Sequence, residues 1–181
     1  IKLHRPEAEV FWWLDSALRP LLEGDRDLAG IIPFERQRWG SPRHWGELWQ
    51  SLRELRAHRF DWVIDLQSLL RSAAFAWVAN GGFTVGLDDR REGAPGFYDG
   101  AGPRPTPLTH AVDWYLQALG PLGVPAQRDF TWLPERPVVA RAVREKWNLG
   151  GERWVALQPG ARWENKRWPV AHFIEMTRRC A

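Results

Sequence analysis

The segment 60–88 constrains the fold most, because it places two short apolar runs on either side of one amphipathic stretch. The first run, "FDWVIDLQ" at 60–67, is almost uninterrupted, which is typical of a parallel strand buried on both faces. From Leu69 to Val78 the apolar residues recur at helical spacing, and Asn80 then supplies a helix end. The second run, "FTVGLD", follows at 83–88. This order predicts a parallel sheet in an α/β fold.

Similar patterns extend in both directions from this segment. Before it we expect two short strands and then a helix that starts near Ser41-Pro42 and has its apolar positions from Trp45 to Leu55. After it, residues rich in Gly, Pro and Arg predict a long functional loop, and Thr109 is expected to cap the helix that follows. The remaining expected elements are strands at 9–14 and 29–34, the loop at 89–107, a weak strand near 129–133, a helix at 138–148, a strand at 153–158 and a helix from about 169.

Proline and glycine residues around 134–152 indicate a domain boundary. We predict that residues 1–136 form a Rossmann-like N-terminal domain and that 137–181 form a linker helix and the start of a second Rossmann-like domain. The chain begins with Ile1 rather than Met and stops inside an expected helix. We therefore expect it to be part of a longer protein.

Charge and composition narrow the function classes. The net charge of +3 and the pI of about 9.5 suit a nucleic acid, an anionic membrane or a phosphorylated substrate. The sequence contains no apolar stretch long enough to span a membrane and no visible signal peptide. The five His lack metal-ligand spacing, so we expect no metal site, and the single Cys180 excludes an internal disulfide.

Lysine is rare in this chain, which uses Arg for nearly all of its positive charge. Of 25 Lys and Arg residues, only Lys2, Lys146 and Lys166 are Lys. Lys166 lies in "WVALQPGARWENKRWPVAHF", between an expected strand and an expected helix. The turn at Gly160-Ala161 can bring backbone N–H groups close to phosphate oxygens, and Lys166 adds a flexible point charge. The stretch is neither a Walker A loop nor a G-x-G-x-x-G motif, and an exposed Lys beside a packing Trp remains the alternative.

Two further segments lie where ligands bind in open α/β sheets, beyond the carboxyl ends of strands. Gln67 and Ser68 place polar groups beside a helix start, although Asp65 or Ser68 could simply cap that helix. Arg90 and Arg91 lie in the glycine-rich "DDRREGAPGFYDG" at 88–100. They could hold a phosphate or carboxylate, or belong to a solvated run of charges.

Four segments, in order, resemble glycosyltransferase family 9, the bacterial lipopolysaccharide heptosyltransferases. They are "FDWVIDLQSLLRSAAFA", "VGLDDRREGAPGFYD", "THAVDWYLQALGPLGV" and "VALQPGARWENKRWP". The resemblance covers most of the chain from about residue 9 onward. It implies the GT-B fold, in which an N-terminal domain receives the acceptor and a C-terminal domain binds the nucleotide sugar.

The implied reaction is an inverting, metal-independent transfer of heptose from ADP-heptose to the lipopolysaccharide inner core, with no cofactor. Lys166 matches the family lysine that contacts the donor diphosphate, and Gly160 and Ala161 match the turn beside it. On the acceptor side, Arg91, with Arg90 next to it, lies where the family faces the acceptor's phosphorylated sugars, and Gln67 and Ser68 lie at the cleft edge. The family usually has Gly at the position of Ser68.

The family's first strand and the Gly-Asp turn with the catalytic base are expected before residue 1. Gly24-Asp25 does not match that turn, because it follows a helical segment. The nucleotide-specific acidic and His motif is expected after residue 181, so these residues alone are expected to be inactive. Asp65 and His110 look more like heptosyltransferase I, whereas the Pro159-Gly160-Ala161 turn looks more like heptosyltransferase II.

Two other functions remain open. One is a different nucleotide-sugar transferase of the same fold, since a fold does not fix a substrate. The other is a non-enzymatic basic α/β module that binds anionic partners. The Arg residues are dispersed and many Trp fall at core spacing, so we expect no nucleic-acid partner. The expected partners are ADP-heptose and the lipopolysaccharide core with lipid A, and the expected location is the cytoplasm, at the inner face of the inner membrane.

Overall fold

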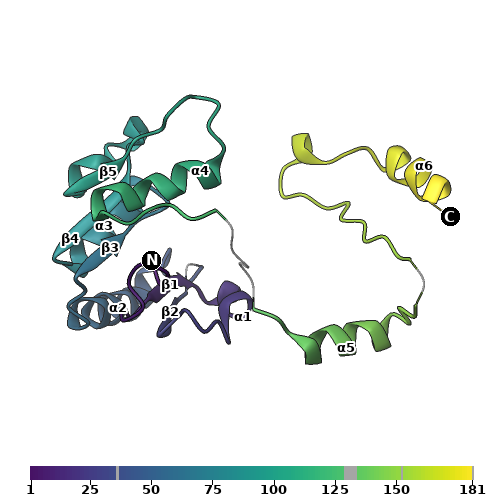
Figure 1. The fold of residues 1–181 in the computed structure, drawn as a ribbon, viewed down its shortest axis with the longest axis horizontal. Helices are drawn as coiled ribbons and strands as arrows, with labels where there is room; N and C mark the ends of the chain where they lie inside the picture. Colours follow the sequence, from purple (N-terminus) through teal and green to yellow (C-terminus); the bar gives the residue numbers. More distant parts are fainter. Residues whose placement is uncertain (36, 129–133, 152, 181) are drawn as a thin grey trace. The chain divides into compact units, whose positions relative to one another are not determined.

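The computed structural model describes residues 1–35, 37–128, 134–151 and 153–180. The chain forms two compact units, Ile1–Pro134 and Glu135–Ala181 (Figure 1). All strands of the described chain belong to the first unit, and the second unit contributes two helices. The α/β class with parallel sheets agrees with the prediction from sequence.

The first sheet of unit 1 has two parallel strands, β1 (Phe11–Asp15) and β2 (Gly30–Phe34). They are joined by a 3-10 turn at Ser16–Leu18 and the short helix α1 (Arg19–Leu22). The register pairs Phe11 with Gly30, and a Cβ at Gly30 would lie 2.8 Å from the Phe11 ring. Glycine at the start of β2 therefore makes room for an aromatic side chain on β1.

The second sheet has three parallel strands in the order β3-β4-β5. These are β3 (Trp62–Ile64), β4 (Phe83–Leu87) and β5 (Gly100–Gly102). Val85 and Leu87 of β4 are fully buried in a core cluster with Trp114, Ala118 and other apolar side chains. The central strand is thus covered as its apolar sequence predicts.

Helices α2 (Trp45–Ala57) and α3 (Leu70–Ala79) pack against each other and against strands from both sheets. Their shared core contains Ile32 of β2, Leu52 and Leu55 of α2, and Ala79 of α3, with Val63 of β3 packed against it. Asn80, in the left-handed conformation at φ 54°, ends α3 as predicted. The two sheets are therefore linked through side chains rather than through backbone hydrogen bonds.

The predicted loop at 89–107 is more structured than expected. It contains 3-10 turns at Arg90–Glu92 and Ala94–Phe97 and the whole of β5. Pairing of Gly100–Gly102 with Val85–Leu87 shows that the loop prediction was wrong there. The strand consists of "GAG" and lacks the large apolar side chains by which the other strands are recognised.

The cap of the next helix, α4 (Ala111–Leu116), also differs from the prediction. His110 is the N-cap residue, and its Nδ1 accepts a hydrogen bond from the Val112 N–H at 3.3 Å. The Thr109 hydroxyl instead accepts from the Thr106 N–H at 2.9 Å. Thr109 therefore closes the preceding turn, and a 3-10 segment at Gln117–Leu122 continues α4.

Unit 2 contains α5 (Pro137–Lys146), a 3-10 turn at Glu164–Lys166 and α6 (Val170–Cys180). The strand expected at 153–158 does not form, since these residues have no paired strand in the described part of the chain. An apolar run becomes a strand only where a neighbouring strand accepts its backbone hydrogen bonds. The weak strand expected near 129–133 falls outside the described residues.

Candidate functional site

The turn after β3 is organised by the buried carboxylate of Asp65. Its Oδ1 accepts hydrogen bonds from the backbone N–H groups of Gln67 at 2.8 Å and Ser68 at 3.3 Å. Its Oδ2 accepts a hydrogen bond from the Tyr98 hydroxyl at 2.8 Å. Asp65 therefore fixes the path of the backbone that leaves the sheet and ties it to a residue 33 positions later in the chain.

Ser68 is buried and has a left-handed backbone, with φ at 50°. Glycine adopts this conformation at little cost, whereas other residues adopt it rarely. The Ser68 hydroxyl accepts a hydrogen bond of 2.9 Å from the Leu87 N–H at the end of β4. Serine thus satisfies a buried donor that a glycine would leave without this partner.

The start of α3 is capped by neither of the two residues considered from sequence. Its N-cap residue is Leu69, whose N–H donates to the Ser72 hydroxyl at 3.1 Å. The Leu70 N–H donates to the Glu92 carboxylate at 3.0 Å. The loop after β4 therefore places an anion at the positive end of α3, and Asp65 caps only the turn before the helix.

Tyr98 lies across the glycine of β4. A Cβ at Gly86 would come within 2.0 Å of the Tyr98 ring, so a side chain at this position and the ring cannot coexist without movement. Burial raises the pKa of Tyr98 above its ordinary value, and the charge of Asp65 and the hydrogen bond to it raise the pKa further. The phenol therefore stays protonated and remains a donor to Asp65.

Arg90 projects from the loop after β4 and is exposed. Its guanidinium binds Asp88 through Nε at 3.1 Å and through Nη2 at 3.4 Å. This hydrogen bonding, together with the charge of Asp88, raises the pKa of Arg90. The backbone of Arg91 lies in the same 3-10 turn, while its side chain is outside the described part of the structure. Gln67 is exposed, and its backbone N–H donates a hydrogen bond to the Asp65 carboxylate.

The turn that carries Lys166 belongs to unit 2. The Arg167 guanidinium donates a hydrogen bond of 2.7 Å to the Ala161 carbonyl, which closes the turn. Lys166 is exposed, and its N–H donates to the Trp163 carbonyl at 3.1 Å. Trp168 stacks on His172 of α6, with ring centroids 5.1 Å apart. The fold of unit 2 thus holds both ends of the turn and leaves the lysine facing solvent.

Gly160 occupies a backbone conformation open to other residues, since its φ is not in the left-handed region. A Cβ there would meet only the Gln158 amide, at the ordinary contact distance of 3.7 Å. The described fold therefore does not itself require a glycine at residue 160. An apolar hollow lies next to the turn, lined by Leu157, Pro159, Phe173, Ile174, Thr177 and Arg178.

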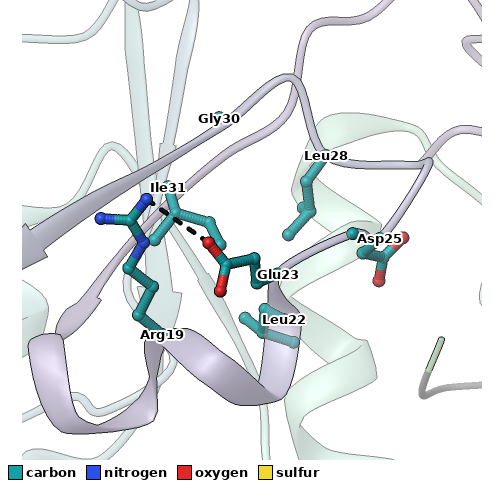
Figure 2. A pocket seen from close by; sticks show the side chains of 8 residues that line it. Arg19, Leu22, Glu23, Asp25, Leu28, Gly30 and Ile31 are labelled. Atoms are coloured by element: carbon teal, nitrogen blue, oxygen red, sulfur yellow. Dashed lines mark ion pairs between the residues drawn. The ribbon is translucent and has the colours of Figure 1, made fainter. Parts of the chain in front are cut away.

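A second hollow lies between α1 and the start of β2 (Figure 2). Arg19 and Glu23 form an ion pair at its rim, 3.5 Å apart. Gly24, with φ at 86°, follows Glu23, the C-cap residue of α1, and the Asp25 carboxylate accepts a hydrogen bond from the Asp27 N–H. Gly24-Asp25 therefore forms a local turn after a helix, as the sequence indicated. The hollow of about 190 Å³ is smaller than typical ligand pockets.

Within the described residues, no group of three or more His, Cys, Asp or Glu side chains could hold a metal ion. No described helix is both long and apolar enough to cross a bilayer.

Comparison with known proteins decides the family. The sequence model of glycosyltransferase family 9 (heptosyltransferase) matches residues 47–181. The chain belongs to glycosyltransferase family 9. None of the curated proteins matches the chain.

Solved structures show the same GT-B fold. E. coli heptosyltransferase WaaC with ADP is 21% identical, with a TM-score of 0.72, and the match covers 97% of this chain and 56% of that chain. A family 9 glycosyltransferase from Veillonella parvula is 20% identical, with a TM-score of 0.74 and coverage of 97% and 51%. E. coli ADP-heptose lps heptosyltransferase II is also 20% identical, with a TM-score of 0.70 and coverage of 99% and 54%. The family 9 chain thus spans just over half the length of these proteins.

In this family 9 chain, the structure brings together two of the three predicted segments. Gln67 and Ser68 follow β3, and Arg90 and Arg91 follow β4, so both pairs lie at the carboxyl edge of one sheet. Lys166, Gly160 and Ala161 lie together in the other unit. The roles of these residues toward a donor or an acceptor remain predictions.

Sequence reasoning missed Tyr98 and the capping role of Glu92. Both act through contacts with residues far away in the chain, on Asp65 and Leu70. The glycine of "FTVGLD" was the available signal for Tyr98, because a glycine inside a buried strand indicates close approach of another group.

Proposed function

We propose that the whole protein is a glycosyltransferase that moves heptose from ADP-heptose to the lipopolysaccharide inner core. The observation that carries this proposal is membership of family 9. Two of the solved relatives support a nucleotide-sugar donor, because one is WaaC with ADP and another is WaaC with ADP-2-deoxy-2-fluoro heptose. Membership of the family supports a glycosyltransferase, whereas the transferred heptose and the lipopolysaccharide acceptor, at about 21% identity to WaaC, are the more specific parts of the proposal.

In this proposal, the turn of unit 2 binds the donor diphosphate. Lys166 supplies a solvent-facing positive charge, and the Arg167 contact with the Ala161 carbonyl holds the turn that presents it. Gly160 is not required by the described fold, so close approach of a phosphate to its backbone would explain the residue. The positive charge of Lys166 would then stabilise the negative charge that develops on the leaving diphosphate.

The acceptor side is assigned to the carboxyl edge of β3 and β4. Arg90 is exposed and held by Asp88, and Arg91 follows it in the same turn. These residues suit the phosphorylated sugars of a lipopolysaccharide core, because guanidinium groups bind phosphates well. Gln67 adds a neutral polar group, and Ser68 shapes the turn through its hydrogen bond from β4.

The proposed reaction is a direct displacement at the anomeric carbon. A carboxylate base takes the proton of the acceptor hydroxyl, the hydroxyl oxygen bonds to the anomeric carbon, and the bond to the diphosphate oxygen breaks. ADP leaves with the bonding electrons, and the configuration inverts. We assign no base within residues 1–181, since family likeness predicts it upstream. Lys166 and backbone N–H groups would stabilise the leaving group without a metal ion.

A second candidate is a transferase of the same fold with another nucleotide sugar, because a fold does not fix a substrate and the solved relatives are only 20–21% identical to this chain. Competition for ADP-heptose binding by ADP, UDP and GDP separates the two candidates. Displacement by UDP or GDP but not by ADP would reject ADP-heptose as the donor.

The main test replaces Lys166 with Ala in the full-length protein and compares kcat/KM for ADP-heptose. We expect a loss of about 100-fold, because a positive charge at the leaving group acts in the transition state. Lys146→Ala is the matched control, since Lys146 is also exposed but lies on α5. Activity of the Lys166 variant within about threefold of the parent would reject the assigned role.

A further inference from the structure

The loop that joins β5 to α4, residues 103–110, carries an arginine at the sheet edge that also holds Arg90 (Figure 1). The register pairs Leu87 of β4 with Gly102 of β5, and the Asp88 N–H donates to the Gly102 carbonyl at 2.9 Å. Arg90 lies two residues beyond Asp88, and Arg104 lies two residues beyond Gly102. Because parallel strands end at one edge, the two arginines leave the sheet on neighbouring segments.

The Arg104 guanidinium is held in place by the fold. It lies over the ring of Trp114, 4.7 Å from the ring centroid, and its Nη2 donates to the Thr109 carbonyl at 3.2 Å. Trp114 is buried, and its indole N–H donates to the Gly102 carbonyl at 3.2 Å. The ring that supports the guanidinium is therefore itself fixed to the end of β5. Within the described residues, the guanidinium donates no other hydrogen bond.

The backbone on either side of Arg104 is restricted. The loop has a fixed φ angle at alternate positions, because these are the prolines Pro103, Pro105 and Pro107. The Thr106 N–H donates to the Thr109 hydroxyl at 2.9 Å, and the Thr109 N–H donates to the Thr106 carbonyl at 3.0 Å. Arg104 therefore loses little conformational freedom when it binds a ligand.

The carboxylates near this edge leave the charge of Arg104 unpaired. They are engaged with other groups, namely Asp65 with Tyr98, Asp88 with Arg90, Glu92 with Leu70, Asp99 with Thr84 and Asp113 with Arg128. Asp89 is engaged as well. Among the residues that the structure describes, no carboxylate forms an ion pair with Arg104, which is exposed.

We infer that Arg104 binds an anionic group of the acceptor, a phosphate or a carboxylate. The inference deepens the proposed function and rests on it for an acceptor made of anionic sugars. A planar guanidinium binds either anion through paired N–H groups, and Arg104 has N–H groups left for this purpose. Arg90 already shares its charge with Asp88, whereas Arg104 offers a fixed charge without a counter-ion.

The test is calorimetric titration of the full-length protein, without donor, with heptose-free lipopolysaccharide from which the ester-linked acyl chains have been removed. Arg104→Gln should weaken binding about tenfold, since a hydrogen bond to a charged group is lost. Arg104→Lys, which keeps the charge without the planar fork, should recover part of the loss. Added salt should reduce the difference between the parent and Arg104→Gln.

Arg5→Gln is the matched control. Arg5 is also exposed, and its guanidinium also lies over an indole ring, 5.9 Å from the ring centroid of Trp62. Trp62 begins β3, so this pair lies at the opposite end of the strands. Arg5→Gln should therefore bind the acceptor like the parent.

Modified acceptors identify the anion. Phosphatase treatment removes phosphates from the lipopolysaccharide, and esterification removes the charge of its carboxylates. The difference between the parent and Arg104→Gln should disappear on the acceptor that lacks the group bound by Arg104. A difference that persists when both groups are modified overturns the inference, because Arg104 would then act only through the structure of its loop.

The inference is also overturned if the parent does not bind the lipopolysaccharide, or if Arg104→Gln binds as tightly as Arg5→Gln. A loss of binding in Arg104→Gln, in a protein that transfers no heptose from ADP-heptose, would support the anion site and reject the proposed reaction. Acceptor binding and transfer are separate observables, so the two proposals can fail independently.

Discussion

At the scale of single residues, the hydrogen bond between Tyr98 and Asp65 links the turn after β3 to the segment that leads into β5. Asp65 is buried, and its carboxylate accepts from two backbone N–H groups as well as from the phenol. A buried carboxylate keeps its charge only where donors replace water. Removing one donor should therefore destabilise the fold as well as the turn at Gln67 and Ser68.

We predict that Tyr98→Phe lowers the free energy of unfolding by about 1–2 kcal/mol, because a hydrogen bond to a charged group is lost from a partly buried site. Urea denaturation at neutral pH measures the loss. Tyr115→Phe is the control, since Tyr115 is exposed on α4. Equal stability of the two variants would show that the Tyr98 hydroxyl contributes nothing.

The same variant should change the response to alkaline pH. The pKa of Tyr98 is raised in the folded protein, whereas an unfolded tyrosine ionises at about pH 10. Above that pH the folded state retains a proton that the unfolded state loses, so this contribution to stability is full below about pH 10 and declines as pH rises. The free energy of unfolding of Tyr98→Phe should therefore fall less steeply above about pH 10 than that of the parent protein.

Gly86 and Gly46 offer a matched pair of substitutions. A Cβ at Gly86 would collide with the Tyr98 ring at 2.0 Å, whereas a Cβ at Gly46 on α2 would meet no atom within 4 Å. We predict that Gly86→Ala destabilises the protein by about 1–3 kcal/mol. Gly46→Ala should stabilise it by up to about 1 kcal/mol, because alanine favours a helix. Thermal unfolding of both variants checks the signs, and a neutral Gly86→Ala would mean that the ring moves freely.

At the scale of elements, α3 depends on a carboxylate from another segment. Glu92 accepts a hydrogen bond from the Leu70 N–H at the start of the helix. We predict that Glu92→Gln lowers stability by about 0.5–1 kcal/mol and that added salt reduces the difference from the parent. Denaturant titration at low and high salt measures this, with Glu54→Gln on the exposed side of α2 as the control. A difference that does not respond to salt would argue against an electrostatic role.

The sequence predicted most elements of unit 1 because their apolar spacing matched a strand or a helix. It failed at β5, where packing of the following helical segment selects small residues. A Cβ at Gly102 would lie 2.5 Å from the Gln117 backbone, and a Cβ at Gly100 would lie 2.9 Å from Pro121. That constraint comes from tertiary contacts and leaves no hydrophobic pattern. The strand expected at 153–158 failed for the opposite reason, since its apolar pattern was present but no described strand pairs with it.

The sequence indicated which segments form the candidate site, but it did not indicate which groups their side chains contact. Ser68 serves the end of β4, and Arg90 is held by Asp88, which are contacts that no local pattern contains. Lys166 was recognised because lysine is rare in an Arg-rich chain. Its function as a diphosphate ligand remains a prediction, as do the roles of Gly160 and Ala161.

At the scale of the whole molecule, the two units differ greatly in burial. Unit 1 contains the core clusters around Val85 and Leu52, whereas the described residues of unit 2 include no buried residue. Stability of a segment follows from the contacts that must break when it opens. The assignment of unit 2 to a donor-binding domain remains a proposal.

We therefore predict that native-state hydrogen exchange of the 181-residue chain separates the two units. Amides of β3 and β4 should be strongly protected, while those of α5 and α6 should exchange orders of magnitude faster, near the rates of an isolated helix. Mass spectrometry of peptides from each unit measures the difference. Comparable protection in both units would show that unit 2 is stabilised by contacts beyond those described.

The crossing of Tyr98 over Gly86 has a consequence for how this sequence can diverge. A side chain larger than glycine is acceptable at residue 86 only after the ring at residue 98 has become smaller. Substitutions at these two positions are therefore not independent, and the order in which residue 98 changes first passes through an intermediate without the collision at residue 86. Among descendants of this chain, the two positions should change in that order or stay as they are.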